Sequence, residues 1–236
     1  MNPHNLSISA APVADLAAQL EIAARQSIAA RGRFCLALSG GSTPRALYEL
    51  LASPEWVQRF EWGKCEIFFG DERAVAPDDA LSNFKMASDA LLNHVVARVH
   101  RMEGERADLE SAAHDYGNLL DATCDRLDVV LLGLGDDGHT ASLFPHSPQL
   151  NEAENWVAAT PIAPMEPRVR RLTLTFPAIN AARRAWFLVS GAGKAARVAQ
   201  VLNGPRDVQR LPSQGVAPQN GELTWCLDEG AAGGLS

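Results

Sequence analysis

Basic residues are scarce in this chain of 236 residues. Lys and Arg together number 21 against 28 Asp and Glu, so the formal net charge is −7. Nucleic acids and anionic membrane surfaces both bind basic protein faces, so this balance argues against either as the main partner. An anionic substrate would need a local cluster of cations that works against the overall charge. We therefore expect a small-molecule ligand, with no nucleic acid and no membrane as partner.

Long apolar runs and targeting signals are also missing. No apolar run approaches the roughly 20 residues that a membrane-spanning helix needs. The N-terminal stretch MNPHNLSISA has neither the basic start nor the apolar centre of a secretory signal. These two absences predict a cytoplasmic protein.

Cysteine is rare as well. The four cysteines lie far apart and form no C-x-x-C pair. Cys35 and Cys226 lie within apolar runs, and Cys65 opens another. We expect buried free thiols here rather than a zinc site.

What the sequence does contain is an alternation of helical and strand-like segments. Hydrophobic residues make up 47% and charged residues 21%, which is ordinary for a globular chain. Apolar residues at helical spacing predict helices near 12–31, 44–52, 83–97, 107–124 and 193–203, with a short one from Pro177. Short apolar runs predict strands at 34–38, 65–69, 128–135, 156–160, 171–175, 185–191 and 223–228.

Strands that alternate with helices predict an α/β fold: a Rossmann-like, doubly wound, mostly parallel sheet with helices on both faces. We expect one domain over residues 1–236, with room for a small extra lobe from the middle helices or the 145–180 region. Ser82 is the expected N-cap of the helix near 83–97. The strand at 171–175 alternates as a half-exposed strand does.

Polar residues gather where four of the predicted strands end. SGGSTP follows the strand at 34–38, GDER follows the strand at 65–69, and GLGDDGH closes the strand at 128–135. SGAGK comes at the end of the strand that begins at Ala185. In open α/β sheets the ligand crevice lies outside the carboxyl ends of the strands, so these four coincidences predict a site at that edge.

The SGGSTP turn has the chemistry of an anion-binding site. Gly40 and Gly41 let the backbone approach a ligand closely, while Pro44 suits the first helical position. Thr43 is the candidate N-cap. The orphan N–H groups at the start of the helix can bind an anion. Three hydroxyl side chains would add further donors: Ser39, Ser42 and Thr43. A plain strand-to-helix turn needs only one glycine and a cap, so the pattern favours phosphate binding. The G-x-x-x-x-G-K-[ST] pattern is missing, which argues against a nucleoside triphosphate.

Two cations accompany these turns. Lys194 stands at the start of a predicted helix, where its charge opposes the helix dipole. A ligand anion there would explain its placement, and a solvated surface lysine is the alternative. Arg73 follows a buried strand beside Asp71 and Glu72. It either forms a structural ion pair that holds the loop or meets the negative charge of a substrate.

The motif GDDGH places Asp136, Asp137 and His139 directly after a buried strand. A neutral imidazole suits general-base work near neutral pH, and Asp137 would orient the ring or bind a substrate hydroxyl. Asp and His are also metal ligands, but this D-x-H spacing without an evident third ligand favours a base over a metal. His139 is therefore the candidate catalytic base.

Four stretches in chain order resemble the 6-phosphogluconolactonase family, within the superfamily of glucosamine-6-phosphate isomerases and 6-phosphogluconolactonases. They are SGGSTP (39–44), DERAV with SN (71–75 and 82–83), GLGDDGHTASLFP (133–145), and RLTLT with GAGK (171–175 and 191–194). LPSQGV near 211 and WCLDEGAA near the end also resemble the closing pattern of the family. The GxGxDGHxASLFP motif is highly specific, whereas sugar-phosphate isomerases and deaminases of related fold share the SGGS turn.

The resemblance implies hydrolysis of 6-phospho-D-glucono-1,5-lactone to 6-phosphogluconate in the oxidative pentose phosphate pathway, with no metal or organic cofactor. It implies that His139 activates water, that Asp137 supports it, and that Arg73 binds substrate or stabilises charge. It assigns phosphate binding to one set of residues: Ser39, Gly40, Gly41, Ser42, Thr43, Lys194 and Arg171. The implied protein is one sugar-phosphate-binding domain, as a monomer or homodimer.

Two positions depart from the family pattern. His146 stands where the family usually has glycine, and Ala76 stands where proline is common. Neither removes a proposed chemical group, so they bear on the shape of the loops rather than on the reaction.

Two other enzyme classes share parts of the pattern. A glucosamine-6-phosphate deaminase-like isomerase would share the fold and the phosphate turn. A serine esterase would use Ser39, because ALSGG is close to the G-x-S-x-G nucleophile elbow. Against the esterase, Asp137 and His139 share one turn, whereas the members of a triad normally come from separate loops.

Overall fold

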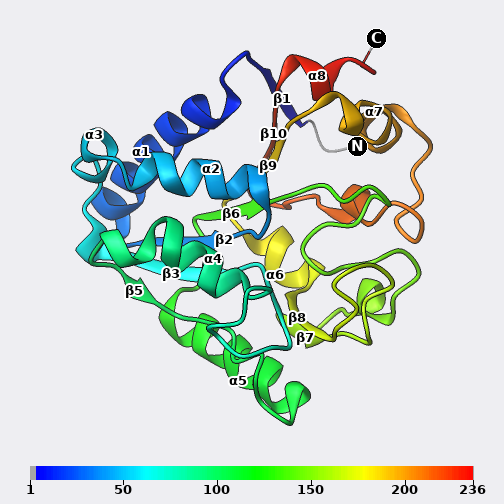
Figure 1. Cartoon of the computed structure of the whole chain (residues 1–236), viewed down its shortest axis with the longest axis horizontal. Coiled ribbons are helices and arrows are strands. Elements are labelled where there is room, and N and C mark those ends of the chain that lie inside the picture. Colours follow the sequence, from blue (N-terminus) through cyan, green and yellow to red (C-terminus); the bar gives the residue numbers. More distant parts are fainter. Residues whose placement is uncertain (1–3, 236) are drawn as a thin grey trace.

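A sheet of seven parallel strands runs through the computed structural model, which describes residues 4–235 (Figure 1). The strand order is β1-β10-β9-β6-β2-β3-β5, and each neighbouring pair is parallel. The strands are Asn5–Ile8 (β1), Phe34–Leu38 (β2), Cys65–Phe69 (β3), Arg98–Val99 (β5), Val129–Leu132 (β6), Arg184–Val189 (β9) and Glu222–Leu227 (β10). The three strands β2, β3 and β6 are buried along their whole length, as expected of strands covered on both faces. The mostly parallel sheet is confirmed.

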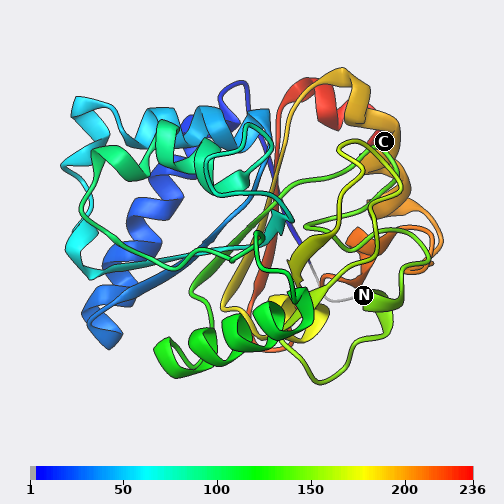
Figure 2. The same cartoon turned by 60° about the horizontal axis from the view of Figure 1, so that its bottom comes forward.

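Helices cover both faces of this sheet. Figure 2 shows α1 and α2 on one side of it and α5 and α6 on the other. Within the described part of the chain the helices are Pro12–Arg31 (α1), Ser42–Leu51 (α2), Pro54–Val57 (α3), Asn83–Ala90 (α4), Leu109–Thr123 (α5), Phe176–Ala181 (α6), Ala195–Asn203 (α7) and Glu229–Ala232 (α8). This arrangement confirms the doubly wound α/β fold.

A second, smaller sheet forms the extra lobe. Its strands Asp71–Arg73 (β4), Arg171–Leu174 (β8) and Val157–Ala159 (β7) pair antiparallel in the order β4-β8-β7. The 145–180 region therefore supplies two of its strands, and the loop after β3 supplies the third. The small sheet brings Arg73 beside Arg171, its register partner.

The strand β8 corrects one prediction. We expected it to be half-exposed, but all four of its residues are buried. Its alternating threonine does not face water, because the Thr173 hydroxyl accepts a hydrogen bond from Ser142 N at 3.0 Å and donates to Leu174 O at 3.0 Å. Internal hydrogen bonds thus replace solvent for this polar side chain.

Several element boundaries also differ from the predictions. The helix expected near 83–97 ends at Ala90 and is followed by a single turn of 3₁₀ helix, Leu92–His94. Its N-cap is Ser82 as predicted, since Ser82 Oγ accepts a hydrogen bond from Lys85 N at 3.1 Å. The strands β1, β4 and β5 were not predicted, because they are two to four residues long and carry no apolar run.

All four cysteines are buried free thiols, as expected. Burial raises the pKa of Cys65 and of Cys226 to about 12 in each case. These two thiols therefore stay protonated at neutral pH and contribute to packing.

Parallel strands end at a common edge of the sheet. The strands β2, β3, β6 and β9 all reach this edge, so the turns that follow them lie close together, and β4 and β8 stand beside them (Figure 1). Between residues 4 and 235, no helix has the length and apolar character required to cross a bilayer.

Candidate functional site

A cavity of about 200 Å³ opens at the carboxyl edge of the main sheet. Six of the ten residues predicted for the site line it: Ser39, Gly40, Gly41, Arg73, His139 and Arg171. Asp137 contacts His139 from outside the lining, and Lys194 contacts Leu134, which is itself part of the lining. Three of the four turns that the sequence pointed to thus line one cavity, and the fourth reaches its edge through Lys194.

The imidazole of His139 is held by its neighbour in the motif. His139 Nδ1 lies 2.6 Å from Asp137 Oδ1, and the same oxygen accepts a hydrogen bond from His139 N at 3.0 Å. With the proton on Nδ1, the ring donates to the carboxylate and keeps a lone pair on Nε2. Within residues 4–235, Nε2 has no hydrogen-bond partner. The side chain is 16% exposed, so a water molecule in the cavity can reach it.

The carboxyl of Asp137 is kept ionised by this contact. Burial by itself raises its pKa, but the hydrogen bonds from the ring and the backbone N–H of His139 and the charge on that ring outweigh burial, so the pKa lies below the ordinary aspartate value. Asp137 therefore remains a hydrogen-bond acceptor that fixes the orientation of the imidazole.

The position of the ring depends on Gly135. A Cβ atom at Gly135 would lie 2.0 Å from His139 Nδ1, so no other residue fits under the imidazole. Gly135 N also donates to His139 O at 2.9 Å, which closes the turn. The glycine in the motif is thus required by close contact with the candidate base.

The SGGST turn corrects the prediction for Thr43. The helix α2 begins at Ser42, and its N-cap is Gly41 with φ 111, so Thr43 lies inside the first turn and does not cap it. No side chain caps this end, which leaves orphan N–H groups for a ligand. Tyr48 holds the preceding residue, because its hydroxyl accepts from Ser39 N at 2.9 Å and donates to Ser39 O at 2.8 Å.

Two arginines with unsatisfied donors line the cavity. The buried Nε atoms of Arg73 and Arg171 have no hydrogen-bond partner in residues 4–235. Arg73 Nη1 donates to Leu81 O at 2.6 Å, and Arg171 Nη2 donates to Pro167 O at 3.3 Å. Among the described residues Arg73 makes no ion pair, so the structural ion pair considered from the sequence is wrong. Two charged guanidinium groups, each with an Nε–H that has no acceptor, are suited to bind an anionic ligand.

Burial lowers the pKa of Arg171, and the charge of Asp71 opposes that change. Asp71 Oδ2 lies 3.8 Å from Arg171 Nη1 and accepts a hydrogen bond from Ser142 Oγ at 2.6 Å. Arg171 nonetheless keeps its charge, because arginine is protonated throughout the physiological range. Within residues 4–235 the ion pair of Arg171 with Asp71 is long, at 3.8 Å and with no direct hydrogen bond, so the guanidinium keeps donors for a ligand.

Glu72 organises the loop that carries Arg73. One carboxylate oxygen accepts from Arg73 N and Asn83 N, both at 2.7 Å. The other accepts from Phe84 N at 2.7 Å and Ser82 Oγ at 2.9 Å. Burial raises the pKa of Glu72, and these four hydrogen bonds oppose the rise. The carboxylate is a structural centre rather than a partner for substrate.

Replacing Glu72 by glutamine should destabilise the fold. The amide NH₂ of the variant would face two donors that now share one carboxylate oxygen, so buried N–H groups lose their acceptor. We expect a loss of about 3 kcal/mol in the free energy of unfolding, measured by urea denaturation. The control is Glu61→Gln, which alters an exposed ion pair with Lys64 and should change stability by less than about 1 kcal/mol. Equal stabilities of the two variants would contradict this role.

Two further polar residues line the cavity: Asn83, which the sequence did not single out, and Asp71, which it placed only as a neighbour of Arg73. Asn83 Nδ2 donates to Asp71 O at 2.9 Å and lies 3.2 Å from Asp71 Oδ1. A Cβ at Gly40 would lie 2.1 Å from Asn83 Oδ1, so this amide packs directly on the glycine turn. The signal for Asn83 was its place in the SN stretch of the resemblance, and the signal for Asp71 was its position beside Arg73 at the end of a buried strand.

Lys194 is neither solvated nor unpaired. Its Nζ donates to Leu134 O at 2.8 Å and to Asp136 Oδ1 at 2.5 Å. The lysine is the N-cap residue of α7 and does not itself line the cavity. The ion pair with Asp136 rules out the solvated lysine, and the role of Lys194 in ligand binding stays a prediction.

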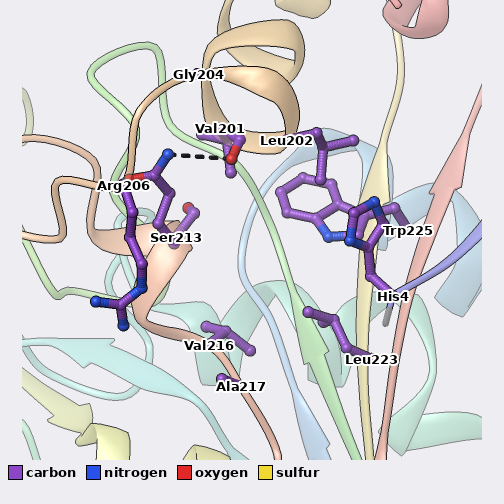
Figure 3. A pocket seen from close by; sticks show the side chains of 11 residues that line it. His4, Val201, Leu202, Gly204, Arg206, Ser213, Val216, Ala217, Leu223 and Trp225 are labelled. Carbon is purple, nitrogen blue, oxygen red and sulfur yellow. Dashed lines mark hydrogen bonds between the residues drawn. The ribbon is translucent and has the colours of Figure 1, made fainter. Parts of the chain in front are cut away.

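A second cavity, of about 100 Å³, is lined by residues of α7, of β10 and of the loop between them (Figure 3). Val201, Leu202, Val216, Leu223 and Trp225 give it apolar walls. Ser213 also lines it, and both Ser213 N and Ser213 Oγ donate to Gly138 O, at 3.0 and 2.9 Å. The wall of this cavity therefore fixes the backbone beside the candidate base.

Comparison with known proteins identifies the family. Residues 8–225 match the family model of glucosamine-6-phosphate isomerases/6-phosphogluconolactonase. The chain belongs to this family. A 6-phosphogluconolactonase of Synechocystis sp. is 42% identical over 221 residues, covering 89% of this chain and 88% of the relative. The 6-phosphogluconolactonase of Mycobacterium tuberculosis is 41% identical over 222 residues, with the same coverage of 89% and 88%.

Solved structures of the family share the whole fold. The 6-phosphogluconolactonase from Trypanosoma brucei superposes with a TM-score of 0.88 at 28% identity, and the match covers 99% of this chain and 99% of that one. The resemblance inferred from the four sequence stretches is therefore confirmed.

One of the two departures from the family pattern, His146, lies at a left-handed backbone position. His146, where the family usually has glycine, adopts φ 58, the left-handed region that glycine enters without strain. The backbone here keeps a glycine-like conformation despite the side chain, and His146 N still donates to Gln209 O at 2.8 Å. The loop at His146 therefore has the backbone conformation that a glycine would favour.

Among residues 4–235, no group of three or more His, Cys, Asp and Glu side chains is arranged to hold a metal ion. That the protein works without a metal or an organic cofactor stays a prediction.

Proposed function

We propose that this chain hydrolyses 6-phospho-D-glucono-1,5-lactone to 6-phospho-D-gluconate, in the oxidative branch of the pentose phosphate pathway. One observation carries the proposal: an imidazole held by a carboxylate lines the same cavity as two guanidinium groups with unsatisfied donors. The first supplies a base for water, and the second supplies charge for an anionic sugar. The names of the relatives support the same activity.

Catalysis begins with binding of the phosphate. The N–H groups and hydroxyls of the turn over residues 39–43, together with Lys194 and Arg171, hold the phosphate at the start of α2. Binding energy from this remote group fixes the lactone carbonyl beside His139.

His139 then acts as general base. Its Nε2 accepts a proton from water as the water oxygen forms a bond to C1 of the lactone. Arg73 stabilises the negative charge that develops on the carbonyl oxygen. The bond between C1 and the ring oxygen breaks, and the ring oxygen takes the proton back from Nε2. Base catalysis of this kind contributes about 10²–10⁴-fold in rate.

The experiment is a rapid assay of freshly generated lactone with the purified protein at mildly acidic pH, where spontaneous hydrolysis is slower. Acid release is followed with and without protein. A clear acceleration over the spontaneous rate is expected, and no acceleration at any protein concentration would overturn the proposal. Glucosamine 6-phosphate is assayed in parallel, since turnover of that substrate alone would favour the deaminase-like alternative.

The serine esterase alternative has less support. Ser39 Oγ donates to Gly40 O at 3.3 Å, and within residues 4–235 it has no hydrogen bond with His139. A nucleophilic serine needs the base within hydrogen-bond reach. We expect that an organophosphate leaves both Ser39 and the lactonase activity unmodified, as measured by mass spectrometry and by the rate. Stoichiometric labelling of Ser39 with loss of activity would reverse the assignment.

The remaining features of the proposal concern the whole molecule. We propose one sugar-phosphate-binding domain over residues 1–236, acting in the cytoplasm as a monomer or homodimer. Its ligand is a small molecule, with neither nucleic acid nor membrane as partner.

A further inference from the structure

The ion pair between Lys194 and Asp136 lies at the edge of the proposed phosphate site. Lys194 Nζ donates to Leu134 O and to Asp136 Oδ1, and Leu134 lines the cavity. An ammonium group has three N–H donors, so one remains for another acceptor. The Asp136 side chain is 85% exposed, whereas that of Lys194 is 29% exposed. The lysine is thus fixed by its partners, while the carboxylate has room to leave.

The backbone at Asp136 is held separately from its side chain. Arg197 Nε donates to Asp136 O at 2.7 Å, and Arg197 Nη1 donates to Gln200 Oε1 at 2.7 Å. A rotation of the carboxylate away from Lys194 therefore breaks one ion pair and leaves the loop in place. The neighbouring carboxylate, Asp137, contacts His139 instead, so the two acidic residues of the motif have different partners.

We propose that the Asp136 carboxylate occupies Lys194 in place of the substrate phosphate and is displaced when the phosphate binds. The inference rests on the proposed function, in which Lys194 holds the phosphate. A phosphate dianion carries more charge than a carboxylate and offers three acceptor oxygens, so it competes well for the third ammonium donor. A monoanion competes less well. Asp136 would thereby act as a specificity-determining residue that favours dianionic ligands.

The test is Asp136→Asn, with affinity for inorganic phosphate measured by calorimetry and KM measured with the lactone. Removing the competing carboxylate should tighten phosphate binding by roughly threefold to tenfold. Phosphate no longer has to break the weak, exposed ion pair between Asp136 and Lys194, and the negative charge of Asp136 no longer repels it. The gain should shrink as salt is added, since salt screens exposed charges. Unchanged or weaker phosphate binding in Asp136→Asn would overturn the proposal.

The matched control is Asp89→Asn, which removes the same charge from an exposed ion pair with Lys85 on α4. Its phosphate affinity should equal that of the unmodified protein, and an equal gain in both variants would overturn the proposal by assigning the effect to net charge.

A third variant, Lys194→Met, separates this inference from the proposed function. Weaker phosphate binding in Lys194→Met with no gain in Asp136→Asn would overturn the role of Asp136 alone. Unchanged phosphate binding in Lys194→Met would overturn both Lys194 as a phosphate ligand and the inference that depends on it.

Discussion

His139→Gln is expected to lower kcat for the lactone by about 10²–10⁴-fold, the range that a general base supplies. Glutamine has a similar reach but an amide that accepts no proton, so the water facing the lactone loses its base. The phosphate-binding residues lie on other turns, so affinity for inorganic phosphate should stay within about twofold. Initial rates, corrected for spontaneous hydrolysis, give kcat, and calorimetry gives the affinity.

The control is His114→Gln, because His114 is exposed on α5, away from the cavity. Its rate and stability should match those of the unmodified protein. If His139→Gln kept more than about a tenth of the normal kcat, general-base catalysis by His139 would be wrong.

Asp137→Asn is the second large effect. The Asp137 carboxylate fixes the imidazole proton on Nδ1. An asparagine amide can instead donate a hydrogen bond to Nδ1, which moves the imidazole proton to Nε2. Nε2 then has no lone pair to accept a proton from water. We expect kcat to fall by roughly 10²–10³-fold with little change in KM, since tautomer and orientation are lost but binding is retained. Steady-state kinetics across a range of lactone concentrations separates the two parameters. Asp89→Asn again serves as the control for loss of one negative charge.

The effect of Asp137 on stability should depend on pH. Because contact with His139 lowers the folded-state pKa below the unfolded value of about 3.9, the contribution of Asp137 is present above that value and is lost as pH falls through the folded pKa. Asp137→Asn should therefore destabilise the protein at neutral pH and less so in acid, as measured by urea unfolding at both. A deficit that grows on acidification would contradict the ionised hydrogen-bonded pair.

The carboxyl edge was predictable because each of its turns follows an apolar strand and carries its own polar signature. His139 and Asp137 are two residues apart, so local sequence sufficed to pair them. The contact between Gly40 and Asn83 joins residues 43 apart, and the hydrogen bond between Asp71 and Ser142 joins residues 71 apart. Periodicity says nothing of such pairs, because they depend on how the second sheet packs beside the first.

Local rules failed where tertiary structure outweighed them. Thr43 has the chemistry of an N-cap, but Gly41 with φ 111 starts the helix two residues earlier. The alternation in β8 predicted a half-exposed strand, but Thr173 is satisfied by protein hydrogen bonds and stays buried. The position of Lys194 at a helix start predicts either a solvated or a ligand-binding lysine, and no local pattern links it to Asp136, which is 58 positions away.

Strand β1, at one edge of the main sheet, pairs with β10, and among the described residues it has no other neighbouring strand. The partners Asn5 and Thr224 are among the most widely separated in the chain, so β1 is synthesised long before the strand with which it pairs. At a synthesis rate of about 5–20 residues per second, that wait lasts roughly 10–45 seconds. For the last part of that wait, after Val189 and before Glu222 are synthesised, the β10 side of β9 is uncovered, so the nascent chain carries an open sheet edge that cellular chaperones have reason to shield.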